Sequence, residues 1–148
     1  MTSRTRNYLY KTVTHVGVVP VNEAVKRLET NNQTGDDVNE SSPEVWGPKM
    51  WFVLHNGAAH YPFEASDIYA EKMKNFILAL PIMIPCENCK NHALRFIESR
   101  KDKLFIICKK RETLFDFFVD FHNDVNKRQG KKEVSYIEAR QIYQNRQN

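Results

Sequence analysis

The feature of the sequence that most directly implies chemistry is the pair Cys86 and Cys89, which are separated by Glu87 and Asn88 and preceded by Pro85. Proline is favoured in the first turn of a helix, and polar helix formers follow the pair, so the sequence predicts a helix that starts at about Cys86. Residues three apart share a helix face, and the unpaired N–H groups at a helix start stabilise a thiolate, the reactive form of cysteine. The two sulfurs are therefore placed to alternate between a dithiol and a disulfide.

Three interpretations of this pair are open from the residues alone. The first is a redox pair. The second is a zinc site with a Cys3His ligand set, made of Cys86, Cys89, His92 and Cys108. The third is an inert buried pair. Because the chain has three cysteines, they cannot all pair within it, and a small disulfide-stapled scaffold is not expected.

Length, charge and hydropathy exclude several classes of protein. A chain of 148 residues is long enough for one domain with its own core. The net charge of +4 is mild, and the basic stretch 100–111 is better interpreted as a solvated surface than as a nucleic-acid site. The longest apolar run, 76–84, contains Pro81 and is much shorter than the ~20 residues that a membrane span requires. We expect neither nucleic-acid binding nor a membrane span.

The first 42 residues differ from the rest of the chain. Residues 1–42 are predicted to form an N-terminal arm, whose last part, 30–42, is almost entirely polar and is expected to be a flexible linker. Residues 43–148 are expected to form a helical domain. Its first helix has a capping-box pattern at 41–44, with Pro43 near the first turn.

Apolar periodicity and helix start signals predict five helices and no reliable sheet, which indicates an all-α bundle. The predicted helices are, in order, 43–61, 67–80, 86–99, 113–129 and one that opens at the capping box Ser135-x-x-Glu138 and runs through Tyr143. The apolar run 104–108 is ambiguous between a strand and a buried loop. Thioredoxin-type folds need βαβ units around their Cys-x-x-Cys motif, so the helix count weighs against them.

The first predicted helix carries two stripes of residues. The inward stripe is made of Trp46, Met50, Val53, Leu54, Gly57 and Tyr61. Beside it, Trp51, His55 and Ala58 recur at i, i+4 and i+7. From spacing alone, such a second stripe is more often part of a core than of a ligand site.

Three clusters together carry a resemblance to a known family: Trp46-Gly47-Pro48-Lys49-Met50-Trp51-Phe52-Val53-Leu54-His55, Cys86-Glu87-Asn88-Cys89, and His122-Asn123-Asp124-Val125-Asn126 followed by Gly130-Lys131. In this order and spacing they resemble the Erv/ALR family of FAD-linked sulfhydryl oxidases. The motifs of that family are Trp-Gly-x-x-x-Trp-x-x-Leu-His, Cys-x-x-Cys, and His-Asn-x-Val-Asn with a nearby Gly-Lys. The resemblance covers about 45–143, and the compact form is most similar to the versions of large cytoplasmic DNA viruses.

The resemblance implies a fold and a cofactor site. The fold would be a four-helix bundle with a short fifth helix, binding FAD beside the Cys-x-x-Cys motif, usually as a homodimer. The implied catalytic residues are Cys86 and Cys89, no metal is implied, and the implied cofactor-binding residues are Gly47, Pro48, Lys49, Trp51, His55, Phe117, His122, Asn126 and Lys131. Trp51 and His55 would pack on and hydrogen-bond the flavin nucleotide. The adenosine end would lie at His122 and Asn126, and Lys131 would neutralise the pyrophosphate.

The implied reaction is the formation of protein disulfides. A substrate thiolate would attack Cys86, and Cys89 would leave as a thiolate that passes its electrons to FAD, then to O2, giving hydrogen peroxide. The implied partners are protein dithiols, among them a separate small dithiol carrier protein. The compartment would be the host cytoplasm or the virion for a viral protein, or alternatively the mitochondrial intermembrane space. The rival function is a zinc-stabilised helical interaction module without catalysis.

The chain departs from the family pattern at two places. Phe117 stands where the family usually has tryptophan, so it offers an aromatic face without an indole N–H. The structural disulfide that family members often have near the last two helices cannot form within this chain, because only Cys108 remains. We expect a free buried thiol there, with a bridge to another chain as the alternative. For His92, tuning of the cysteine pair and simple packing are both open.

Overall fold

A computed structural model describes residues 39–144 of the chain. The predicted arm therefore lies outside the described residues apart from 39–42. The described part contains the α-helices α2 (Pro43–Ala59), α3 (Asp67–Ala79), α4 (Glu87–Glu98), α5 (Leu104–Ile107), α6 (Arg111–Arg128) and α7 (Tyr136–Tyr143). Two 3-10 turns, η2 (Leu80–Met83) and η3 (Lys101–Lys103), precede α4 and α5. Residues 39–144 form no strand, only an isolated bridge between Glu64 and Lys110, so the predicted all-α class is confirmed.

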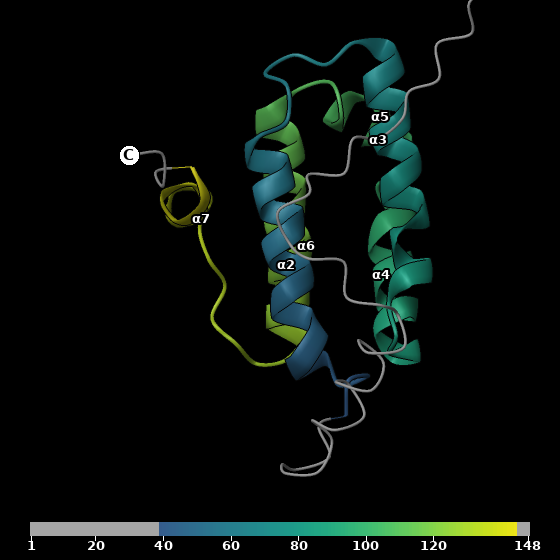
Figure 1. The fold of residues 1–148 in the computed structure, drawn as a ribbon, viewed down its shortest axis with the longest axis vertical. Helices are drawn as coiled ribbons and strands as arrows, with labels where there is room; N and C mark the ends of the chain where they lie inside the picture. Colours follow the sequence, from purple (N-terminus) through teal and green to yellow (C-terminus); the bar gives the residue numbers. More distant parts are fainter. Residues whose placement is uncertain (1–38, 145–148) are drawn as a thin grey trace, which may run out of the picture. The chain divides into compact units, whose positions relative to one another are not determined.

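The helices pack as a bundle in which α2 lies along α6, α3 along α4, and α4 along α6 (Figure 1). The chain runs up α2, down α3, up α4 and down α6 in this view. The starts of α2 and α4 and the end of α6 therefore meet at one end of the bundle, while α5 lies at the other end. The short α7 packs on α2 and α6 from the side.

Local sequence signals set several helix ends. The Ser66 side chain accepts a hydrogen bond from the Tyr69 N–H, and Ser135 and Glu138 form the predicted capping box at α7. Gly130 has φ +65°, the left-handed conformation that commonly follows a helix end. These three predictions are confirmed.

The predicted capping box at the start of α2 is wrong. Ser42 stands at the N-cap position and Pro43 follows it in the first turn, but the Ser42 side chain caps no backbone N–H. Its hydroxyl instead donates to the Glu44 carboxylate. The two side chains satisfy each other because Glu44 lies two residues after the N-cap, whereas a capping box needs the acidic residue three after it.

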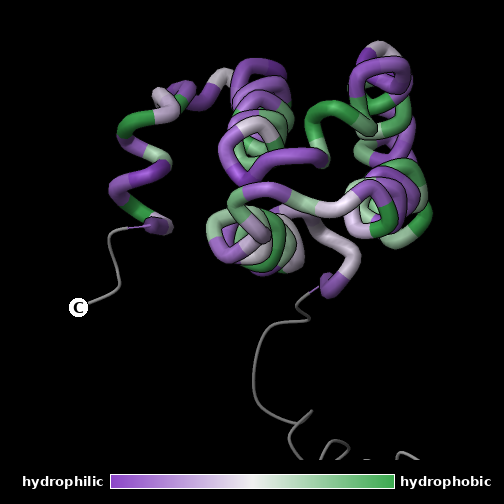
Figure 2. Tube along the Cα trace, turned by 90° about the horizontal axis from the view of Figure 1, so that it is seen from above, coloured by the Kyte–Doolittle hydropathy of each residue, from purple (hydrophilic) through white to green (hydrophobic). Residues whose placement is uncertain are grey.

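The core is built mainly by α6, whose buried residues are Leu114, Phe115, Phe117, Phe118, Val119 and Phe121. These include four of the five residues predicted for its core face, and the fifth, Val125, is half-buried. On α4, the three predicted inward residues, Ala93, Phe96 and Ile97, are also buried. In Figure 2, hydrophobic and hydrophilic positions alternate along the helices, as amphipathic packing requires.

Four residues predicted to face inward are exposed, and Gly57 is one of them. Val53 on α2 is 64% exposed, and Tyr69 and Phe76 on α3 are about half exposed. On α2, His55 and Ala58 of the second stripe are buried, and His55 meets α6 at His122 and Phe115. Leu54 and Tyr61 of the first stripe are buried as well, so the buried side of this segment combines residues of both stripes, which spacing alone does not reveal.

The apolar run 104–108 is neither a strand nor a loop. It forms the helical turn α5, and Cys108 is its C-cap. Four apolar residues are too few to show a period, so the sequence could not distinguish these structures. Within residues 39–144, no helix is long and apolar enough to cross a membrane.

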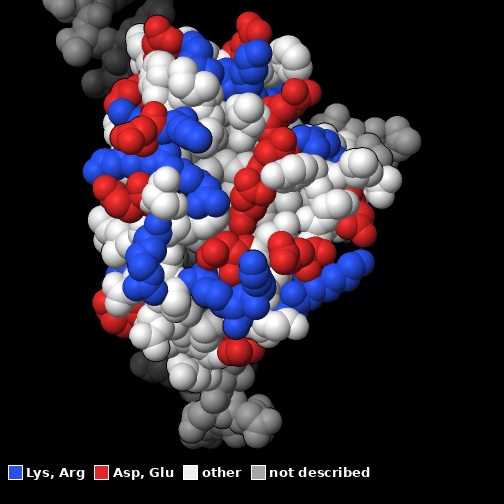
Figure 3. Space-filling view, turned by 180° about the vertical axis from the view of Figure 1, so that it is seen from behind, with Lys and Arg blue, Asp and Glu red and all other residues white. Residues whose placement is uncertain are grey.

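Charged side chains of both signs are mixed on the face that Figure 3 shows. Part of the basic stretch 100–111 is paired: Lys101 bonds Glu98 and Lys109 bonds Asp67, at N–O distances of 2.9 and 2.7 Å. Exposed pairs of this kind contribute little to stability. They do reduce the local excess of positive charge.

Candidate redox site

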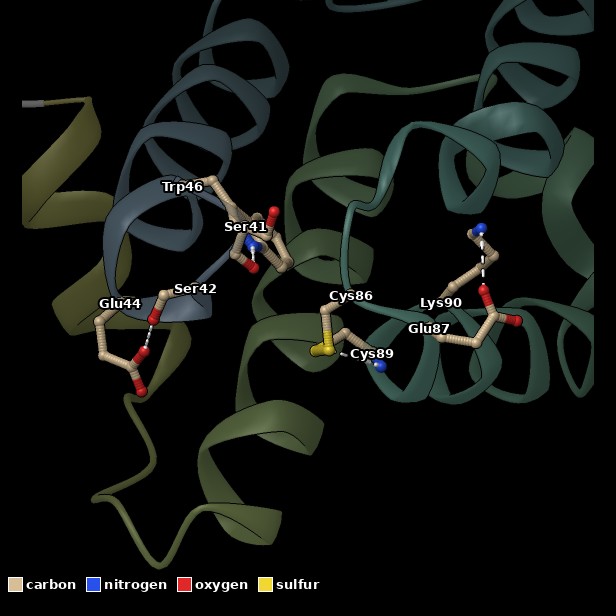
Figure 4. The surroundings of a disulfide bond; sticks show 8 residues. All are labelled: Ser41, Ser42, Glu44, Trp46, Cys86, Glu87, Cys89 and Lys90. Atoms are coloured by element: carbon tan, nitrogen blue, oxygen red, sulfur yellow. Dashed lines mark hydrogen bonds and ion pairs between the residues drawn. A yellow bond between two sulfur atoms is a disulfide. The ribbon is translucent and has the colours of Figure 1, made fainter. Parts of the chain in front are cut away.

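The two cysteines of the Cys-x-x-Cys motif form a disulfide at the start of α4. Cys86 is the N-cap residue and Cys89 lies in the first turn, with the two Cα atoms 5.2 Å apart. The backbone N–H of Cys89 donates to Cys86 Sγ at 3.3 Å. Figure 4 shows the disulfide between the start of α2, marked by Trp46, and the ion pair of Glu87 with Lys90. When the bond is reduced, the N–H groups and dipole of this helix start stabilise a thiolate.

A cavity of about 670 Å³ lies beside one of the two cysteines of the disulfide, Cys89. Cys89 lines this cavity, whereas Cys86 is half-exposed and does not. The remaining lining residues are Pro43, Glu44, Trp46, Gly47, Pro48, Met50 and Trp51 from α2, Ile84, His92 and Ala93 around α4, Phe121, His122, Val125, Asn126, Arg128, Gln129 and Lys131 from α6 and its end, and Tyr143 from α7. The volume lies within the range of about 300–1,000 Å³ that is usual for small-molecule and cofactor sites.

One wall of the cavity is flat and aromatic. The indole of Trp51 stacks on the imidazole of His122, with ring centroids 4.2 Å apart and planes 7° from parallel. Phe121 meets Trp51 edge-on at 5.2 Å. Such surfaces suit a planar conjugated ring, because aromatic faces stack in offset or edge-to-face arrangements.

A histidine pair supports this wall from behind. His55 is 2% exposed, and its Nε2 lies 3.1 Å from Nδ1 of the half-buried His122. Burial, followed by the neighbouring His122, lowers the pKa of His55 to about 4. Burial, followed by Lys131, lowers the pKa of His122 to about 4 as well. Both rings are therefore neutral at pH 7, so one nitrogen donates to the other.

The end of the cavity near α6 is basic. Gly130 turns the chain, and the backbone N–H of Lys131 donates to the Asn126 carbonyl at 2.9 Å, so that Lys131 returns to the cavity wall. Arg128 lines the same region. The Lys131 ammonium is suited to bind a phosphate group, whereas the Arg128 guanidinium pairs with Asp124 at 2.8 Å. The carboxylate residue Glu44 also lines the cavity.

The segment that carries Lys131 is fixed by Asn123. Its side-chain amide donates to the Val134 carbonyl at 2.8 Å, and its side-chain oxygen accepts from the Val134 N–H at 2.9 Å. One side chain thus reproduces both hydrogen bonds of a strand pair. The loop between α6 and α7 is held against α6 as a result.

The predicted cofactor residues fall into two groups. Those that line the cavity are Gly47, Pro48, Trp51, His122, Asn126 and Lys131. The other three do not line it: His55 lies behind the wall, Phe117 is buried against Phe96 with ring centroids 5.6 Å apart, and Lys49 is exposed on α2.

Two residues without a predicted role also belong to the site. Asn123 belongs to the sequence cluster 122–126, and its position one residue after His122 was the only indication that it lies at the site. Tyr143 stacks on His55 at 4.7 Å. Its position depends on the docking of α7, through Arg140 to Asp116 and Tyr136 to Asp120, and no local pattern indicates those contacts.

The predicted Cys3His ligand set is not assembled. Cys86 and Cys89 are bonded to each other, and Cys108 is a free, fully buried thiol at the α5 end of the bundle. Within residues 39–144, no three His, Cys, Asp or Glu side chains are grouped to hold a metal ion. The zinc interpretation is therefore wrong, and the predicted burial of Cys108 is confirmed.

His92 lies one turn after Cys89 and lines the cavity. Its Nδ1 accepts a hydrogen bond from the Arg95 guanidinium at 2.8 Å. Partial burial lowers the pKa of His92, and the charges of Arg128 and Arg95 lower it further. A neutral imidazole therefore borders the cysteine pair.

The sequence was compared with models of known protein families. The model of the Erv1 / Alr family matches residues 48–145, which include every helix from α3 to α7 and most of α2. The chain belongs to the Erv1/Alr family. The resemblance inferred from the three sequence clusters is thereby confirmed.

Relatives in this family come from viruses and from yeast. A protein of Invertebrate iridescent virus 6, with the provisional name FAD-linked sulfhydryl oxidase 347L, is 34% identical over 97 residues, 64% of this chain and 87% of that protein. The FAD-linked sulfhydryl oxidase of African swine fever virus, isolate Pig/Kenya/KEN-50/1950, is 32% identical over 101 residues, 67% of this chain and 80% of that protein. The crystal structure of the yeast Erv1 core has the same fold, with a TM-score of 0.66 at 24% identity over 78% of this chain and 95% of that chain.

Proposed function

We propose that this Erv1/Alr-family protein is an FAD-dependent thiol oxidase that forms disulfides in protein dithiols and uses O2 as the final electron acceptor. The observation that carries the proposal is the position of the disulfide: Cys89 lines the cavity and Cys86 does not. A redox pair between solvent and a cofactor-sized cavity is suited to carry electrons from one to the other. The relatives named above carry the name FAD-linked sulfhydryl oxidase, which agrees with this chemistry.

The residues around the cavity fit FAD. Its volume of about 670 Å³, its flat wall of Trp51 and His122 and its basic end at Lys131 match a molecule with planar rings joined by a pyrophosphate. Gly47 is a buried residue of the lining, and a Cβ at this position would meet no atom within 4 Å. The missing side chain therefore leaves space inside the cavity that a cofactor can occupy.

We assign the cofactor-binding roles from these positions. Trp51 and His122 stack on the planar parts, Gly47 and Pro48 border them, and Lys131 with Asn126 holds the opposite end. His55 acts from behind the wall, by fixing the orientation of the His122 ring. Phe117 acts indirectly, because it packs on Phe96, which stacks on Phe121 of the cavity lining. Lys49, exposed on α2, contributes charge at the edge of the site.

The chain's own residues perform the thiol chemistry. A substrate thiolate attacks Cys86 Sγ, a mixed disulfide forms, and the Cys86–Cys89 bond breaks with its electron pair on Cys89. A second substrate thiolate then displaces Cys86, so that one substrate disulfide forms and both cysteines are reduced. When bound, FAD supplies the two-electron acceptor between Cys89 and O2, which becomes hydrogen peroxide. Because Nδ1 of His92 accepts a hydrogen bond from the Arg95 guanidinium, the hydrogen of this neutral ring is on Nε2, which can donate to a nearby acceptor.

The partners follow from the same geometry. The chain has no cysteine besides Cys86, Cys89 and Cys108, so protein dithiols, including a small dithiol carrier protein, must approach Cys86 directly. We also propose a homodimer, because large apolar side chains on α2 and α3 are exposed, namely Phe52, Val53, Ile68, Tyr69 and Phe76. The viral relatives favour the host cytoplasm or the virion as the compartment, with the mitochondrial intermembrane space as the alternative.

The proposal is tested with the full chain, expressed with an ample supply of FAD and purified. We expect a yellow protein with about one FAD per chain, which consumes O2 and releases hydrogen peroxide in equal amounts when dithiothreitol is added. The Cys89→Ser variant should keep the yellow colour and lose the oxygen consumption. A folded wild-type protein that is colourless and inert toward thiols would overturn the proposed function.

The dimer is tested separately by sedimentation velocity. The wild type should sediment as a dimer, and Phe52→Glu should shift it toward the monomer because a charge is then buried at the contact. Wild-type protein that stays monomeric at high micromolar concentration would contradict this part of the proposal.

A further inference from the structure

The segment directly before the disulfide exposes two large apolar side chains. Ile82 is 76% exposed and Met83 is 74% exposed, which makes them the most exposed large apolar residues among 39–144. Both belong to η2, whose other residues, Leu80 and Pro81, are buried, as is Ile84 after it. The segment is therefore anchored in the core and still presents an apolar pair, Ile82 and Met83, to solvent.

The apolar pair and the outer sulfur lie on one stiff unit. Met83 precedes Cys86 by three residues, and because consecutive Cα atoms are 3.8 Å apart, their Cα atoms are separated by at most about 11 Å. The N–H of Ile84 donates to the Pro81 carbonyl at 3.1 Å, and Pro85 fixes the backbone just before the cysteine. A protein that brings a sulfur into contact with Cys86 therefore also comes close to this pair.

The charges beside the disulfide are largely neutralised. Glu87 and Lys90 pair with each other on α4 at 3.2 Å. These two charges offset each other, so this pair does not favour a partner of one sign. The exposed pair itself offers apolar contact, and methionine is well suited to it because its side chain adapts to different shapes.

We propose that Ile82 and Met83 form a docking surface for the reduced protein substrate. The occupant is a loop or extended segment of that substrate that carries a large apolar residue next to its attacking cysteine. The inference rests on the proposed oxidase function and adds a substrate preference to it. Docking lowers the KM for such substrates and leaves the sulfur exchange unchanged: the substrate sulfur bonds to Cys86, and the Cys86–Cys89 bond breaks with its electron pair on Cys89.

The test uses two synthetic dithiol peptides that differ at one position. Both contain Cys-x-x-Cys, and the residue before the first cysteine is leucine in one and serine in the other. Dithiothreitol is the third substrate, because it is too small to reach the apolar pair while its sulfur is at Cys86. Oxygen consumption gives kcat/KM for the wild type, for the double variant Ile82→Ser with Met83→Ser, and for the matched control Ile106→Ser. Ile106 is 66% exposed on α5, at the opposite end of the bundle.

In the wild type we expect kcat/KM for the leucine peptide to exceed that for the serine peptide roughly tenfold, as burial of much of one leucine side chain implies. The double variant should lose this preference and oxidise dithiothreitol as fast as the wild type. Ile106→Ser should retain the preference.

Equal rates for the two peptides in the wild type would overturn the inference while leaving the oxidase function intact. The same holds if the double variant keeps the preference, or if Ile106→Ser loses it equally. A double variant that instead sediments differently from the wild type would show that another copy of the chain covers the pair, and this too would overturn the inference. Absence of dithiothreitol oxidation in the wild type would refute the oxidase function itself, so the two failures are distinguishable.

Discussion

The chain places its cysteines in two opposite environments, at the two ends of the bundle. Cys86 is the N-cap of α4, where a backbone N–H donates to its sulfur, and its partner Cys89 opens onto the cavity. Cys108 is the C-cap of α5 and is fully buried, and burial raises the pKa of its thiol to about 12. Helix polarity and access to solvent, not residue type, therefore separate a reactive cysteine pair from an inert thiol.

The largest effect is expected at the reactive end. Cys86→Ser removes the sulfur that accepts the substrate thiolate, so oxygen consumption with dithiothreitol should fall to the background of free FAD. The flavin content should stay near that of the wild type, because Cys86 does not line the cavity. An oxygen-electrode assay together with a flavin absorption spectrum measures both quantities. Wild-type turnover by this variant would show that Cys86 is not needed for oxidation, and would contradict the contrast between the reactive pair and the inert Cys108.

The next effect concerns the cavity of about 670 Å³ at the reactive end. Gly47 and Gly57 both lie in α2, and a Cβ at either would meet no atom within 4 Å, but only Gly47 lines the cavity. Gly47→Leu should therefore fold and lose most of its FAD, whereas Gly57→Leu should retain it. The flavin-to-protein absorbance ratio of the two purified variants gives the result. Equal FAD content in both would show that the cofactor lies elsewhere.

The two ends of the bundle also differ in how much of their structure could be predicted from the sequence. The caps at Ser66 and Ser135 and the turn at Gly130 were predictable because each depends on residues within one turn. The helical turn α5 was not, because four apolar residues show no period. The cavity was predictable only through the family resemblance, since its walls join segments far apart in the chain. Tyr143 shows the limit, because its place beside His55 depends on an ion pair and a hydrogen bond between α7 and α6 that no local pattern encodes.

The stability of the protein should depend on pH because of the histidine pair behind the cavity wall. His55 and His122 have pKa values of about 4 in the folded protein, below the usual value of 6.5. The unfolded chain therefore binds more protons between pH 6.5 and 4, and the free energy of unfolding falls as the pH drops through this window. FAD release, followed by flavin fluorescence, should occur in the same window. Full FAD retention down to pH 4 would contradict the placement of the pair.

A smaller effect is expected from the loop that carries Lys131. Asn123→Ala removes both hydrogen bonds to Val134, each worth about 1 kcal/mol, and should weaken FAD binding several-fold and lower the Tm. Asn75→Ala, at an exposed position on α3, is the matched control and should change neither. Titration of the apoprotein with FAD measures the affinities. Identical affinities in the two variants would mean that the loop needs no such support.

The smallest effect on turnover is expected at the inert end. Cys108→Ala should keep the wild-type kcat with dithiothreitol, and its only cost should be a modest loss of stability, on the order of 1 kcal/mol, from the lost buried sulfur. Iodoacetamide should not label Cys108 in the folded protein at pH 8. Rapid labelling, or a large loss of activity in the alanine variant, would show that this thiol is not inert.

The most direct test of the central claim is anaerobic reduction of the bound flavin, recorded by stopped-flow absorbance after mixing with dithiothreitol. The wild type should bleach within the time of one turnover, because electrons pass through Cys86 and Cys89 to the cofactor. Cys89→Ser should hold the same flavin and stay yellow under the same conditions. Bleaching of Cys89→Ser at the wild-type rate would show that thiols reach the flavin without the cysteine pair, and would contradict this account.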